Sequence, residues 1–102
     1  MKAVLIKESK GDIEEIELDI HPRKYEIFKL LRGSGTFVGQ FPESDVVIMK
    51  GVNHTIENEN SLVEPFHEET IHGPILLIRM DENAEHQDLT LQECNLHYIS
   101  NN

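Results

Sequence analysis

Two short runs of apolar residues most strongly constrain how this chain can fold. Residues 3–6 read AVLI between two lysines, and residues 75–80 read ILLIRM after a Gly-Pro pair. Apolar runs of this length are typical of strands that are covered on both faces. We therefore expect a sheet in which both runs are buried strands and in which the first lies centrally.

The segment after the first run predicts an N-terminal hairpin. ESKGD at residues 8–12 supplies Gly and Asp for a turn. Apolar and acidic side chains then alternate strictly: Ile16, Leu18 and Ile20 against Glu15, Glu17 and Asp19. This alternation predicts a half-exposed strand with an acidic outer row.

HPRKYEIFKLLRG at residues 21–33 predicts a helix over residues 22–32. Pro22 suits the first helical position, and Ile27, Leu30 and Leu31 have the spacing of one apolar face. Gly33 can close the helix in the left-handed conformation. We expect this helix to pack on one face of the sheet.

A second hairpin is predicted farther along the chain. Residues 36–41 form its first strand, with Phe37 and Phe41 on one side, and the turn PESD leads into a strand at residues 46–49. Residues 51–65 have weak periodicity, which predicts a loop with one short strand near residues 61–63.

The C-terminal part predicts a short helix. The acidic residues 81–88 are expected to leave the sheet. Thr90 and Glu93 then have the spacing of a capping box, after which Leu91, Cys94 and Tyr98 share one helical face.

A chain of 102 residues has the length of one domain, because two cores would leave each half marginally stable. We expect residues 1–102 to form a single α+β domain. Its sheet is predicted to be mixed but largely antiparallel, with about five strands, the one helix on a face and the short C-terminal helix. Cys94 is the single cysteine, so no internal disulfide and no cysteine-based zinc site can form.

The charge of the chain limits its partners. Nineteen Asp and Glu against nine Lys and Arg give a formal net charge of −10. This charge repels phosphate backbones and anionic membrane surfaces, so we expect no direct nucleic-acid binding and no membrane binding. No apolar stretch approaches the roughly 20 residues that cross a bilayer, and no secretory signal is recognisable. We expect a soluble intracellular protein, cytoplasmic or nuclear.

HEETIH at residues 67–72 raises the question of a metal site. A zinc-protease motif places two histidines four positions apart on a helix, so that both rings face one metal. His67 and His72 are five positions apart. This spacing turns the rings about 140° from each other on a helix and puts them on opposite faces of a strand. We expect an exposed acidic loop without a metal.

DENAEHQDLTLQE at residues 81–93 partly follows the pattern of a calcium-binding EF-hand loop. Asp81, Asn83 and Glu85 occupy alternating positions, as ligands of such a loop do. The likeness then fails, because His86 stands where glycine is required and Gln92 where a bidentate glutamate is required. No serine or cysteine lies in a recognised nucleophile motif. We therefore predict no catalytic residue, no cofactor and no metal ion.

Three segments together resemble a known group of proteins: MKAVLIKESKGDIEEIELD, FKLLRGSGTFVGQFPESDVVIM and PFHEETIHGPILLIRMDENAEHQDLTLQE. They are similar to a family of small uncharacterised proteins, a domain of unknown function, from algae and their large DNA viruses. More distantly, they resemble a domain of unknown function from phages and plasmids. The most specific part is residues 73–90, where His86 stands in place of an expected proline. The resemblance implies a viral or algal setting and brings no site residues.

The favoured prediction is a non-enzymatic protein-binding or regulatory module that contacts an unidentified protein through the loops at residues 51–72 and 81–88. One alternative is an acidic DNA mimic that inhibits a DNA-binding protein. Another is a small metal-dependent enzyme that uses His67, Glu68 and His72. The strand at residues 16–20, at an open edge, could also pair with a second copy and give a homodimer.

Overall fold

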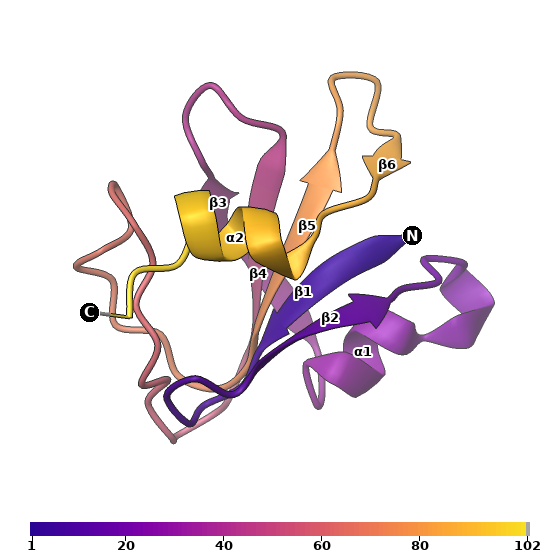
Figure 1. The fold of residues 1–102 in the computed structure, drawn as a ribbon. Coiled ribbons are helices and arrows are strands. Elements are labelled where there is room, and N and C mark those ends of the chain that lie inside the picture. Colours follow the sequence, from indigo (N-terminus) through magenta and orange to yellow (C-terminus); the bar gives the residue numbers. More distant parts are fainter. Residues whose placement is uncertain (102) are drawn as a thin grey trace.

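The chain folds as an antiparallel sheet with two short α-helices, in agreement with the predicted α+β class (Figure 1). The computed structural model describes residues 1–101. Its elements in chain order are β1 (Lys2–Ile6), β2 (Ile13–Glu17), η1 (Pro22–Lys24, a 3₁₀ turn), α1 (Glu26–Leu30), β3 (Gly35–Gln40), β4 (Val46–Gly51), β5 (Ile75–Met80), β6 (His86–Gln87) and α2 (Leu91–His97). The strand order is β2-β1-β5-β4-β3, and β6 pairs with β5.

The two apolar runs of the sequence are the interior strands β1 and β5, as predicted. Successive side chains of a strand point to opposite faces, so each run feeds two separate apolar clusters. Val4, Ile6, Ile75 and Leu77 join the cluster that also contains Cys94 of α2. The alternate side chains, those of Ala3, Leu5, Leu76 and Ile78, join a second cluster on the other face. Leu31, at the end of α1, packs in this second cluster. The helices therefore cover opposite faces of the sheet.

The predicted continuous helix over residues 22–32 is wrong in extent. Tyr25 has a φ of 53° and separates η1 from α1. Two short-range side-chain bonds flank this break: the Glu26 carboxylate accepts the backbone N–H of Asp19 at 3.1 Å, and the Asp19 carboxylate accepts that of His21 at 2.9 Å. The strand β2 ends at Glu17, before the predicted limit at Ile20, which is 42% exposed.

The end of α1 also differs in detail from the prediction. The N–H of Gly33 donates to the carbonyl of Phe28 at 2.9 Å, and that of Arg32 donates to Lys29 at 3.2 Å. This is a Schellman arrangement, and its left-handed position belongs to Arg32, with φ 53°, rather than to Gly33. Arg32 also pairs with Glu8, which ties the helix end to the β1–β2 turn.

The second hairpin, β3 and β4, contains an irregularity that the sequence pattern did not predict. Phe37 pairs with Met49 and Gly39 with Ile48, so Val38 is an extra residue on β3. Such a bulge reverses the side-chain alternation beyond it. Phe41 is consequently buried at 3% exposure while Phe37 is 61% exposed, and the prediction that they share one side is wrong.

The acidic segment after β5 does not leave the sheet, contrary to prediction. It turns at residues 81–85 and returns as β6, where His86 pairs with Met80. The N–H of Leu89 then donates to the backbone carbonyl of Lys2 at 2.9 Å, and the backbone N–H of Lys2 donates to the Asp88 carboxylate at 2.7 Å. The returning segment therefore lies between β1 and β5 at the end where these two strands no longer pair with each other.

Residues 51–72 form an irregular layer on the α2 side, held by two buried asparagines. Asn58 donates to the carbonyls of Ile6 and Gly73 at 3.2 and 2.9 Å, and Asn60 donates to Lys7 at 2.7 Å. The short strand predicted near residues 61–63 is reduced to one bridge between Leu62 and Ile99.

The C-terminal helix forms as predicted. The Thr90 hydroxyl accepts the N–H of Glu93 at 3.2 Å, and Cys94 is buried. Within residues 1–101, no helix has the length and apolar character that crossing a bilayer requires.

Candidate functional site

The histidines singled out by the sequence do not come together. His67 lies in an exposed loop, where its Nε2 is 3.8 Å from the Glu68 carboxylate, and His72 forms an isolated bridge with Glu57. Across residues 1–101, no three His, Cys, Asp or Glu side chains are grouped closely enough to hold a metal ion. His67, Glu68 and His72 therefore present separate exposed side chains, while Ile71 between them is buried in the core.

The carboxylate of Asp81 closes its own turn. One oxygen accepts the N–H groups of Asn83 and Glu85, both at 2.9 Å, and the other accepts the Gln87 amide at 3.2 Å. These bonds, that of Glu85 foremost, lower the pKa of Asp81 below its usual value. The segment with partial EF-hand spacing is thus a tight turn that leads into β6.

Cys94 faces the core between α2 and the sheet. Its side chain has no exposed surface, and burial raises the pKa of its thiol to about 12, with a smaller contribution from the Glu93 charge. A reactive cysteine needs an accessible thiolate. Cys94 therefore serves as a packing residue.

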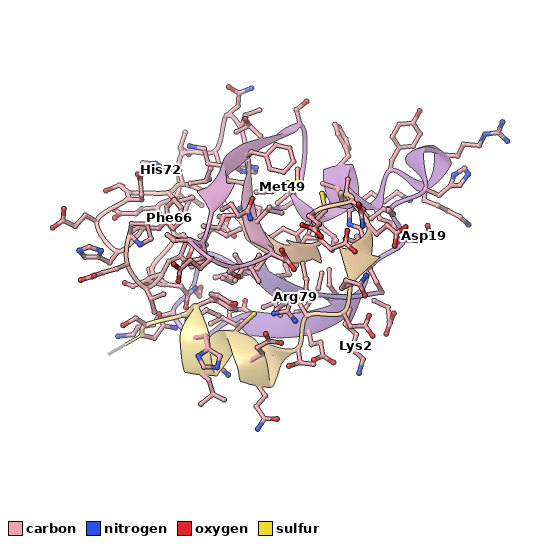
Figure 2. All side chains as sticks on the ribbon, turned by 90° about the horizontal axis from the view of Figure 1, so that it is seen from above. Lys2, Asp19, Met49, Phe66, His72 and Arg79 are labelled. Carbon is pink, nitrogen blue, oxygen red and sulfur yellow. The ribbon has the colours of Figure 1, made fainter. Side chains whose placement is uncertain are left out.

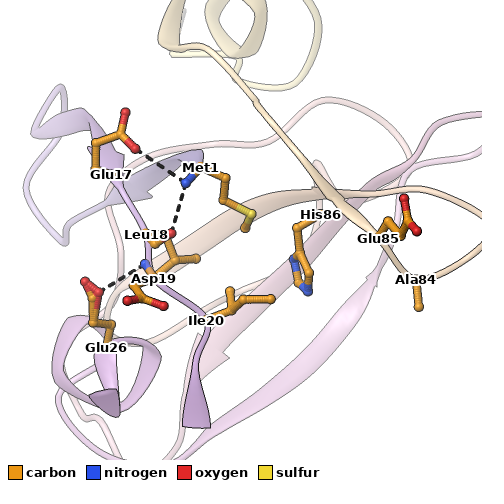
Figure 3. A pocket seen from close by; sticks show the side chains of 9 residues that line it. All are labelled: Met1, Glu17, Leu18, Asp19, Ile20, Glu26, Ala84, Glu85 and His86. Carbon is orange, nitrogen blue, oxygen red and sulfur yellow. Dashed lines mark hydrogen bonds and ion pairs between the residues drawn. The ribbon is translucent and has the colours of Figure 1, made fainter. Parts of the chain in front are cut away.

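A hollow of about 740 Å³ lies where the ends of β1 and β2 meet the β5–β6 turn (Figure 3). Its floor is apolar and is formed by Met1, Leu18 and Ile20. Its other walls carry most of the polar groups: Glu17, Asp19, Glu26, Glu85 and His86. We call this concave feature, defined by these residues and Ala84, the acidic hollow.

Three segments position the acidic hollow. Buried Leu18 exchanges hydrogen bonds with the backbone of Met1, at 2.7 and 3.1 Å, which extends the β1–β2 pairing to the rim. Glu26, in the first turn of α1, reaches back to the N–H of Asp19. The Met1 amino group lies 3.4 Å from the Glu17 carboxylate, whose side chain is 75% exposed.

His86 enters the hollow from the third segment. The pairing of β6 with β5 fixes its backbone, and its ring points toward Ile20 (Figure 3). Its Nδ1 atom is buried, and no atom of residues 1–101 hydrogen-bonds to it. A buried polar atom in this state calls for a partner such as water or a ligand. The hollow thus combines apolar surface, carboxylates and one unsatisfied ring nitrogen.

The hollow lies far from the histidines of the predicted metal site. Figure 2 shows His72 and Asp19 at opposite ends of the molecule. Of the two loops predicted as the contact surface, only residues 81–88 contribute, through Ala84, Glu85 and His86. The remaining wall comes from Met1 and from residues that the sequence pattern predicted as a strand and a helix. Ile20 fits the alternation of the predicted strand at residues 16–20, so it gave no signal of the hollow.

Comparison with known proteins gives one match. A family model described as "Family of unknown function (DUF5880)" matches residues 4–96, which is nearly the whole chain. No curated protein and no solved structure matches. The match covers the β1–β2 hairpin and β6, and thus nearly all the residues of the hollow.

Proposed function

Since the chain belongs to a family of unknown function, DUF5880, we propose its role from its own surface: it is a non-enzymatic protein-binding module, and the acidic hollow takes a basic side chain of the partner. The observation that carries this proposal is the combination of four carboxylates with an apolar floor. The stem of Lys or Arg packs on apolar surface while its charged end meets carboxylates.

The charge of the whole protein supports the same partner. A net charge of −10 attracts a basic surface from a distance and accelerates encounter. The floor residues Met1, Leu18 and Ile20 then give the apolar contact that a cation alone would lack. Together these features favour a basic protein segment over a small anion or a nucleic acid.

Acidic mimicry of DNA finds less support. The glutamates of β2 would be the natural substitutes for a row of phosphates, but Glu14 lies on the opposite face from Glu15 and Glu17, and each lies near a cation of residues 1–7. Glu14 is 3.8 Å from Lys7, Glu15 is 4.0 Å from Lys2, and Glu17 is near the Met1 amine. Partial neutralisation along the row weakens a mimic, which needs free carboxylates at regular spacing.

A titration followed by NMR tests the proposal. The probe is a peptide in which lysine alternates with valine, and a glutamate–valine peptide is the control ligand. We expect the lysine peptide to shift the amide signals of Asp19, Glu26, Glu85 and His86, and the glutamate peptide to leave them unchanged. The double variant E26Q/E85Q should weaken binding about tenfold, which corresponds to about 1.4 kcal/mol.

The matched control variant is E68Q/E69Q. It removes the same two charges from an exposed loop away from the hollow, and Glu68 is 89% exposed. Equal weakening by both double variants would reduce the interaction to general charge attraction and overturn the proposal. Absence of any shift in the wild-type protein would overturn it as well.

A further inference from the structure

The sheet has two outer strands, and they differ in their ability to accept a further strand. β3 carries the bulge at Val38, and its register shifts between Phe37 and Gly39. A bulge disrupts the row of groups that an added strand must match. β2 pairs regularly with β1 over its whole length, from Ile13 to Glu17, and forms the opposite edge (Figure 1).

The hydrogen-bond alternation leaves specific backbone groups free on β2. Leu18 exchanges bonds with Met1, and Lys7 donates to Asp12. In an antiparallel pair, hydrogen-bonded positions alternate, so Glu15 and Glu17 direct their N–H and C=O groups away from β1. Within residues 1–101, the backbone N–H groups of Glu15 and Glu17 have no hydrogen-bond acceptor. These groups form a ready template for an added strand.

The side chains of this edge select against a second copy of the chain. β2 reads IEEIE and contains no Lys, Arg or Pro. In every two-fold antiparallel register that pairs β2 with itself, Glu14, Glu15 or Glu17 lies directly opposite another carboxylate. Like charges in directly opposed positions destabilise a strand pair. A basic strand would place opposite charges in the same positions.

We propose that β2 accepts an extended basic segment of a partner protein as an additional strand, and this inference rests on the proposed function of the acidic hollow. Main-chain bonds to Glu15 and Glu17 would give the affinity, and lysine or arginine side chains would give the selectivity. The edge ends at Leu18 and Asp19, which line the hollow. A strand added to β2 would therefore end beside the hollow, next to the residues that the edge and the hollow share.

Two variants of one residue isolate the backbone contribution. E15P removes the outward N–H at the centre of the edge, and proline there costs no bond to β1. E15A removes the same carboxylate, including its bond to the N–H of Leu91 at 3.0 Å, but keeps the backbone N–H. We expect the lysine–valine peptide to bind E15P about tenfold more weakly than E15A. Hydrogen exchange should show protection of the Glu15 and Glu17 amides in wild-type protein with peptide.

The outcomes separate this inference from the proposed function. If the peptide binds E15P and E15A equally and the Glu15 amide gains no protection, strand addition is overturned while the hollow remains a binding site. If the wild-type protein does not bind the peptide at all, both proposals fail. If E15P binds the peptide more weakly than E15A, the NMR amide signals of β1 and β2 in E15P show whether this hairpin is still folded. Preserved signals with the tenfold loss support strand addition, and lost signals overturn the claim that this N–H faces away from β1.

Discussion

His54 and Leu31 connect the irregular loop to the end of α1: the ring Nε2 lies 2.9 Å from the Leu31 carbonyl oxygen. This contact satisfies one of the carbonyls that a helix end leaves without a partner. The ring reaches Leu31 because two neighbouring residues are glycines. A β-carbon on Gly51 would lie 2.6 Å from the ring, and one on Gly73 would lie 2.5 Å from it.

The first prediction separates this steric role from backbone strain. Gly11 and Gly73 have nearly equal positive φ values, 83° and 84°, but a β-carbon on Gly11 would meet no atom within 4 Å. We expect G11A to lower the free energy of unfolding by about 1 kcal/mol from strain alone. G73A should cost about 1–3 kcal/mol more, because His54 must move. Urea denaturation measures both, and equal losses would contradict the packing of His54 against Gly73.

The second prediction concerns the ion pair between Arg79 of β5 and Glu93 of α2. Arg79 bonds both oxygens of Glu93, with Nη1 to Oε1 at 3.0 Å, and these bonds lower the pKa of Glu93. A lowered carboxyl pKa stabilises the folded state above the unfolded-state pKa, and this stability is lost as pH falls through the folded-state value. E93Q should therefore cost about 1 kcal/mol at neutral pH.

The difference between E93Q and wild type should vanish in acid. Denaturant unfolding at neutral pH and at an acidic pH below the folded-state pKa of Glu93 tests this, since the carboxyl of wild-type Glu93 becomes protonated as pH falls through that lowered pKa. E69Q, at an exposed position, is the matched control and should show no such pH-dependent difference. A constant difference between E93Q and wild type at both pH values would mean that lost packing, rather than charge, explains the effect.

The third prediction concerns the thiol of Cys94. Because burial raises its pKa to about 12 and hides it from solvent, the folded protein should not react with a thiol reagent such as DTNB in mildly alkaline buffer. The same protein in concentrated urea should react completely. Rapid stoichiometric labelling of the folded protein would show that α2 opens readily from the sheet.

Much of the fold follows from local patterns. The apolar runs predicted β1 and β5, the alternation around Glu15 predicted β2, and the capping box predicted α2. The errors arose where distant residues decide the local structure. The helix is interrupted at Tyr25, where the carboxylate of Glu26 accepts the N–H of Asp19, and the segment after β6 is held to the first strand by the bond of Leu89 to Lys2. No periodicity in the chain reports such bonds.

The acidic hollow could not be predicted for the same reason. Its residues come from the open end of the β1–β2 pairing, from the first turn of α1 and from a turn about seventy positions later in the chain. The sequence showed only that carboxylates are abundant, which singles out none of them. The conspicuous HEETIH segment, by contrast, has its side chains apart because its loop is irregular.

The fourth prediction tests the bulge at Val38, on which the β3 edge argument depends. Without it, Phe37 and Phe41 would lie on one side of β3 and would be comparably buried. With it, Phe41 packs against Phe66 and Tyr98, with ring centroids 5.2 and 4.8 Å away, while Phe37 is largely exposed. We expect F41A to lower the free energy of unfolding by about 3–5 kcal/mol and F37A by less than about 0.5 kcal/mol. Comparable losses in urea denaturation would mean that β3 pairs with β4 in regular register and offers a second continuous edge.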